Sequence, residues 1–193
     1  MGIKKISYRF WKKDSIRKLS WIRNNIHSYD KVLDLGCGPC WVTFFLRSEG
    51  IDTTPVDIRN NSVVGDIEPI IYNGKRLPFE DDEFDTTLLL TVLHHVSDPA
   101  ALLQEAKRVS KRIIIVEDIH SNAIQKILVE ALDALLNLEF LGHPHSNLRD
   151  DQWKEVFHQM DLLLREKQYH SMSGLFKQAV YVLDKRIEHA GEK

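Results

Sequence analysis

The residues best placed for chemistry form a glycine-rich turn that follows an acid. Residues 32–40 read VLDLGCGPC, an apolar strand candidate that carries Asp34 and opens into the turn. Glycines at positions 36 and 38 permit positive φ and let a ligand approach the backbone without an intervening Cβ. A helix start after the turn offers unpaired N–H groups to a carboxylate or phosphate, and Pro39 is expected in its first turn.

A second carboxylate ends the next strand candidate. Asp57 follows Gly36 by about twenty residues, the spacing at which an acid accepts hydrogen bonds from ribose hydroxyls. Taken alone, the two glycines are also explained by a tight connection between a strand and a helix that binds no ligand. The combination with Asp34 and Asp57 favours a ribose-bearing cofactor instead.

Four segments together resemble the class I S-adenosylmethionine-dependent methyltransferases, in their small-molecule, methyltransferase domain 11-like branch. They are residues 32–39, 56–58 (VDI), 77–85 (LPFEDDEFD) and 93–99 (LHHVSDP). The resemblance covers about residues 30–118 and implies a Rossmann-like fold with S-adenosylmethionine as cofactor. The cofactor-binding residues that it implies are Asp34, Gly36, Cys37, Gly38, Asp57, Ile58, Asn73, Gly74, Leu90 and Thr91.

The resemblance also assigns parts of the cofactor to these residues. Asp34 and the two glycines would line the methionine end, and Asp57 would hold the ribose hydroxyls. Asn73 stands where the family usually has an Asp against adenine, and residues 90–91 would lie beside the sulfonium. Cys40 replaces the family's third glycine. The short link after Asp57 implies that part of the adenine pocket is open or covered by another segment, such as the N-terminal one.

Other cofactor and redox classes fit less well. Residues 37–40 (CGPC) match the active-site tetrapeptide of thioredoxin-like oxidoreductases, but Gly36 replaces the expected Trp and the nearest Thr-Pro, at 54–55, is too close. A nicotinamide dehydrogenase needs a third glycine where Trp41 stands. Two cysteines in one turn are a weak metal signal, so no metal is expected. A protein that binds S-adenosylmethionine without catalysis stays open.

Histidines after strand ends are the candidate general bases. An oxygen or nitrogen nucleophile needs a base near pH 7, which histidine supplies. His120 is preferred because residues 117–120 leave the fifth strand toward the expected substrate side. His143 and His145, in the polar loop 142–147, come next. His94 and His95 are expected to begin a helical connection, with one of them capping it.

The elements that must position these residues alternate between strand and helix. This order predicts an α/β fold, with a mostly parallel sheet, helices on both faces and a closing antiparallel hairpin. The expected strands are 31–35, 53–57, 68–72, 84–90 and 112–117, with a hairpin of 162–169 and 176–184. The expected helices are 41–48, 99–109 with Ser97 or Asp98 as its cap, 124–141 and 150–160.

Residues 1–29 form a separate helical segment in this interpretation. It holds eight Lys or Arg residues against the single acid Asp14, interleaved with apolar residues. We expect it to cover one face of the domain with its lysines in solvent. Weak contact with a membrane or a nucleic acid is the alternative.

Composition limits the remaining classes. The 193 residues carry 26 Lys and Arg against 28 Asp and Glu, so no broad field attracts a polyanion and a small-molecule acceptor is favoured. Residues 30–193 are expected to form one domain with a helical insertion at about 121–160. The apolar segment 124–141 is interpreted as a helix over the sheet, or else as a lid or homodimer face. No apolar stretch approaches the roughly 20 residues of a membrane span, so a cytoplasmic location is expected.

Overall fold

The computed structural model describes residues 2–120, 148–172 and 176–186. Within them the chain forms a seven-stranded sheet in the order β3-β2-β1-β4-β5-β7-β6. The strands are β1 (Lys31–Leu35), β2 (Asp52–Asp57), β3 (Ile70–Ile71), β4 (Phe84–Leu90), β5 (Ser110–Ile119), β6 (Leu162–Met172) and β7 (Phe176–Lys185). The expected helix 124–141 lies outside the described residues.

Strand directions confirm the predicted α/β class. Neighbouring strands among β1 to β5 pair in parallel, whereas β7 runs antiparallel to both β5 and β6. The central strand β4 is buried on both faces, as expected for an apolar strand in a covered parallel sheet. Parallel strands end at the same edge of a sheet, so the segments after β1, β2, β4 and β5 emerge side by side.

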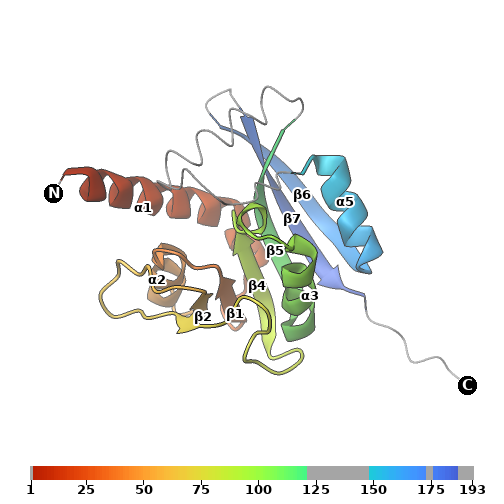
Figure 1. The fold of residues 1–193 in the computed structure, drawn as a ribbon, viewed down its shortest axis with the longest axis horizontal. Coiled ribbons are helices and arrows are strands. Elements are labelled where there is room, and N and C mark those ends of the chain that lie inside the picture. The colour runs from red at the N-terminus through yellow and green to blue at the C-terminus, as the bar shows by residue number, and fades with distance from the viewer. Residues whose placement is uncertain (1, 121–147, 173–175, 187–193) are drawn as a thin grey trace, which may run out of the picture.

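Helices cover both faces of the sheet (Figure 1). On one face, α1 (Gly2–Ile22) and α2 (Trp41–Ser48) pack against alternate strand residues such as Val32 and Ile114. On the other face, α3 (Pro99–Val109) and α5 (Asp150–Gln159) pack against the residues between them, such as Leu33 and Ile113. This alternation follows from the two-residue repeat of a strand. None of the helices in the described ranges is long and apolar enough to cross a bilayer.

The structure corrects several predicted boundaries. β5 extends over Ser110–Ile119 rather than 112–117, and β6 over Leu162–Met172 rather than 162–169. The third strand is shortened to Ile70–Ile71, because Pro69 has no N–H to pair and restricts the residue before it. Pro39 does not start α2, which begins at Trp41 after Cys40 with a φ of +63°. The cap of α3 is as expected, since the Asp98 side chain accepts from the Ala101 N–H at 2.9 Å.

Candidate functional site

Three of the predicted site segments meet at the carboxyl edge of the sheet. Asp34 of β1 pairs with Leu88 of β4, and Leu35 pairs with Val56 of β2. The turns that follow these three strands therefore leave the sheet beside one another. In α/β sheets, ligands bind outside the carboxyl ends of the strands.

The turn after β1 is locked by contacts that only glycine allows. Gly36 has a φ of +77°, and its N–H donates to the Val56 carbonyl at 2.8 Å. A Cβ at position 36 would lie 2.6 Å from Cγ2 of Val92 in the turn after β4. The glycine turn is thus held between two neighbouring strand ends.

Asp57 fixes the second glycine of this turn. Its Oδ2 accepts from the Gly38 N–H at 2.9 Å, while Oδ1 accepts from the N–H groups of Ile58 at 2.7 Å and Arg59 at 3.2 Å. A carboxylate offers about four acceptor positions, so it retains capacity for one more donor. A Cβ at Gly38 would meet no atom of the described residues within 4 Å. The carboxylate is therefore oriented beside open space, as a ligand hydroxyl requires.

Asp34 lies beneath the turn and is buried. Thr43 of α2 donates its hydroxyl to Asp34 Oδ2 at 2.7 Å. Burial raises the pKa of Asp34 to about 6, although the hydrogen bonds from Thr43 act in the opposite direction. A cationic ligand would favour the ionised form of this carboxyl group.

The segments after β2 and β3 gather at one side of the glycine turn. A Cβ at Gly74 would lie 3.6 Å from Cγ2 of Ile58. The Asn73 Oδ1 atom accepts from the N–H groups of Lys75 and Arg76, at 2.9 and 3.2 Å. Contact of Asn73 with a ligand therefore needs the remaining lone pair of this oxygen or the amide nitrogen.

The turn after β4 is held by groups from two other elements. Thr91 has a φ of +59°, and its N–H donates to the Val116 carbonyl at 2.7 Å. Lys18 of α1 donates from Nζ to the Thr91 hydroxyl at 2.7 Å. Glu117 Oε1 accepts from the N–H groups of Val92 at 2.9 Å and Leu93 at 2.7 Å.

The histidines differ in their surroundings. His94 is buried in the short helix η2 (Leu93–His95), where Nδ1 lies 2.5 Å from Glu117 Oε2, so it does not cap α3. His120 directly follows β5 at the same edge of the sheet and is half-buried. His143 and His145 lie outside the described residues.

Sequence reasoning missed Lys18 and Glu117. Lys18 is 5% exposed rather than solvated, and Glu117 is fully buried. The signal for Lys18 was the placement of Asp14, the single acid of the basic segment, one helical turn earlier. The signal for Glu117 was limited to an acid at the end of an apolar strand.

The two cysteines do not have the geometry of an exposed redox pair. Cys37 and Cys40 are both buried, with their Sγ atoms 3.5 Å apart and unbonded. Their shared hydrogen bond and burial raise the pKa of Cys37, whereas that hydrogen bond lowers the pKa of Cys40. The first cysteine, which attacks in a dithiol motif, is thus protonated and covered.

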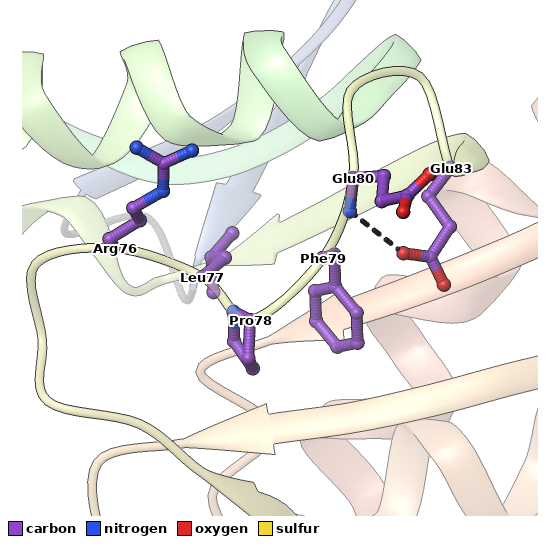
Figure 2. Close-up of a pocket in the computed structure, with 6 residues that line it drawn as sticks. All are labelled: Arg76, Leu77, Pro78, Phe79, Glu80 and Glu83. Atoms are coloured by element: carbon purple, nitrogen blue, oxygen red, sulfur yellow. Dashed lines mark hydrogen bonds between the residues drawn. The ribbon is translucent and has the colours of Figure 1, made fainter.

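A surface depression lies along the segment that returns from β3 to β4. It is lined by Arg76, Leu77, Pro78, Phe79, Glu80 and Glu83. Figure 2 shows these residues along one loop, where the Glu80 N–H donates to the Glu83 carboxylate. Glu83 immediately precedes β4, so this loop leads away from the carboxyl edge. None of the predicted cofactor residues lines the depression.

Comparisons with known proteins agree with this geometry. Residues 33–113 match a family model described as a methyltransferase domain. The ubiquinone/menaquinone biosynthesis C-methyltransferase UbiE of Francisella philomiragia is 30% identical over 155 residues, which cover 70% of this chain and 59% of that protein. The tRNA U34 carboxymethyltransferase of Nautilia profundicola is 31% identical over 105 residues, which cover 48% of this chain and 35% of that protein.

The fold has close structural counterparts. A SAM-dependent methyltransferase from Methanosarcina mazei superposes with a TM-score of 0.68 and 19% identity, covering 86% of this chain and 97% of that one. This similarity confirms the predicted fold class. The chain spans only 35% to 59% of the length of the two curated relatives, so their activities are not carried over as a whole.

Proposed function

Because this chain carries a class I S-adenosylmethionine-dependent methyltransferase domain, we propose that it transfers a methyl group from that cofactor to a small-molecule acceptor. The match to a methyltransferase-domain model and the similarity to a C-methyltransferase support the expected enzyme class and cofactor. The observation that carries the proposal is the contact of Gly38 with Asp57 beside open space. It combines a turn that holds two glycines with an oriented carboxylate, which are the two parts that a nucleoside needs.

The residues present suit this cofactor chemically. Asp34 and Asp57 provide negative charge near a cationic sulfonium compound, and the glycine turn leaves room for it. In the proposed arrangement, Asp34, Gly36, Cys37 and Gly38 surround the methionine end, and Asp57 binds the ribose. Ile58, Asn73 and Gly74 border the adenine, and Leu90 and Thr91 border the sulfonium.

The protein's part in the reaction is alignment. The bound cofactor supplies an activated methyl group for an in-line displacement. Residues at the carboxyl edge hold the cofactor in one orientation, so that a bimolecular encounter becomes a reaction within one complex. We propose His120, His143 and His145 as the candidate bases for an acceptor that must lose a proton.

A small-molecule acceptor is supported by two observations. The near-balanced charge gives no broad attraction for a polyanion. The relative named for quinone biosynthesis aligns with 70% of this chain, against 48% for the relative named for tRNA. The acceptor in this proposal is therefore a small metabolite or a lipid-like molecule.

The basic segment supports a weaker proposal. Tyr8 and Phe10 of α1 are exposed beside Arg9, Lys12 and Lys13, a combination that suits a membrane surface or a nucleic acid. Sedimentation with anionic vesicles and gel-shift with tRNA measure these two contacts. A homodimer and a cytoplasmic location also stay predictions.

Calorimetric titration with S-adenosylmethionine and S-adenosylhomocysteine tests the main proposal. Asp57→Ala is expected to weaken binding of both compounds by about a hundredfold, because a hydrogen-bonded carboxylate and the orientation of Gly38 are lost together. Asp52→Ala is the matched control, since Asp52 is exposed at the other end of the same strand. Wild-type protein that binds neither compound contradicts the proposal.

A further inference from the structure

One charged pair of α1 is buried against the sheet. Lys18 is 5% exposed and Asp14 is 7% exposed, with Nζ and Oδ2 2.6 Å apart. Within the described ranges, Lys18 is the one Lys or Arg side chain that is buried. The free energy lost when two charges leave water is about as large as the free energy gained from their attraction. Apolar side chains would therefore stabilise this helix equally well. The pair therefore needs an explanation beyond packing.

Lys18 reaches the predicted site from a distant part of the chain. Its Nζ donates to the Thr91 hydroxyl at 2.7 Å, and the same hydroxyl donates to the Leu90 carbonyl at 2.6 Å. Arg17 also binds Asp14, which keeps the acid in place beside Lys18. The contact joins the first helix directly to the turn after the central strand.

Thr91 adopts a backbone conformation that its side chain disfavours. A φ of +59° lies in the left-handed region, which a β-branched residue enters only under constraint. Three hydrogen bonds supply that constraint: the N–H bond to Val116, the hydroxyl bond to Leu90 and the bond from Lys18. Strained residues of this kind persist where the surroundings over-determine them, and they cluster in binding sites.

The strained turn at Thr91 also packs against the glycine turn after β1. Val92, the next residue, places its methyl groups where a Cβ of Gly36 would lie, at 2.6 and 2.7 Å. A change in the backbone of Thr91 would therefore move Val92 against Gly36. The position of Val92 therefore affects the conformation in which the glycine turn binds a ligand.

We propose that Lys18 is a positioning residue of the cofactor site. Paired with Asp14, it holds Thr91 in the left-handed conformation, and this fixes Val92 against the glycine turn. The N-terminal helix is then a part of the active site rather than a cover. This inference rests on the proposed function, because its measure is the affinity for the cofactor product.

The test is a double-mutant cycle on the full chain, with S-adenosylhomocysteine as the probe. Lys18→Met keeps the length of the side chain and removes its charge and donors. Thr91→Gly removes the strain, because glycine enters the left-handed region without cost. Lys13→Met is the matched control, since Lys13 is exposed on the same helix. Melting temperatures are recorded for every variant.

The expected pattern separates positioning from packing. Lys18→Met weakens binding about tenfold, the loss of one charge-assisted hydrogen bond, and Lys13→Met changes it less than about twofold. In the Thr91→Gly background, Lys18→Met changes the affinity less than about twofold, because no strain remains to be held. A role confined to stability would instead lower the melting temperature at constant affinity.

Two results overturn the inference: wild-type affinity in Lys18→Met, or the same tenfold loss in both backgrounds. If Lys18→Met does not fold, Thr91→Val removes the same hydrogen bond from the other side. The expected loss is again about tenfold, and unchanged affinity overturns the inference. Wild-type protein that does not bind the probe contradicts the proposed function and the inference with it, whereas normal binding in the variants contradicts the inference alone.

Discussion

Gly36 is constrained by its backbone and by its neighbour at once. Its φ of +77° disfavours any side chain, and Val92 occupies the space of a Cβ. Gly36→Ala is expected to lower the free energy of unfolding by about 3 kcal/mol, from backbone strain and overpacking together. Urea unfolding measures this loss. Gly50→Ala is the control, because Gly50 has a φ of +81° but open space around it, so strain alone should cost about 1 kcal/mol. Equal losses in the two variants would refute the steric argument.

Asp34 makes stability depend on pH. Its folded pKa of about 6 lies above the ordinary value of 3.8, so its stabilising contribution is complete below pH 3.8 and is lost as the pH rises through 6. Asp34→Asn is therefore expected to raise the free energy of unfolding at pH 8, by at most about 3 kcal/mol, and to change it little near pH 3.5.

Chemical unfolding at both pH values measures this difference. Asp52→Asn, at an exposed acid of the neighbouring strand, is the control variant. The burial argument fails if Asp34→Asn has the same effect at pH 8 as at pH 3.5.

Single residues were predictable where one local pattern carried the information. Asp34, Gly36 and Gly38 stand in one turn, and Asp57 follows at a known spacing, so the sequence placed all four at one edge. Lys18 was expected in solvent. This prediction was wrong because Lys18 is held by Thr91, which is 73 residues away in the sequence. A helical pattern of basic and apolar residues does not say which lysine meets the sheet.

At the scale of elements, Glu117 ties β5 to the turn after β4 and to η2. It accepts from two backbone N–H groups and contacts His94. Glu117→Ala removes these three contacts from a buried position, so the free energy of unfolding is expected to fall by about 3–5 kcal/mol. The loss is measured by urea unfolding, with Glu68→Ala at an exposed position as control. A loss below about 1 kcal/mol would show that the turn holds without Glu117.

Elements were predicted well where their own residues decide them. The apolar run of β4 and the Asp98 cap of α3 needed no distant partner. The ends of β3 and the start of α2 depend on Pro69 and on the left-handed conformation of Cys40, respectively. Cys40 takes a backbone conformation typical of glycine, at the position where the resemblance implies a glycine.

At the scale of the whole molecule, α1 has an exposed amino-terminal part and a carboxyl-terminal part with buried side chains. Tyr8 and Phe10 are exposed, whereas Asp14, Lys18 and Leu19 are buried. Removal of residues 1–11 is expected to change the affinity for S-adenosylhomocysteine less than about twofold, since residues 8–10 are exposed and Trp11 is only half-buried. Removal of residues 1–20 should weaken binding at least about tenfold, because it also deletes the contact of Lys18 with Thr91.

Calorimetry on both truncated proteins, with circular dichroism as a check of folding, measures this contrast. If the affinity is retained after removal of residues 1–20, α1 only covers the sheet and does not position the cofactor site. Lost affinity after removal of residues 1–11 would instead assign a function to its exposed turns.

The position of β7 has a consequence for how the chain is made. This last described strand lies between β5 and β6, and its Val180 and Val182 share an apolar cluster with Leu19 and Ile22 of α1. Helix α1, which precedes the sheet in the chain, must therefore wait for a strand that is made after the other described strands. Contacts so distant in sequence form slowly. Until they form, the nascent polypeptide exposes the apolar face of α1 and the unpaired edge of β5, and both are surfaces that chaperones bind.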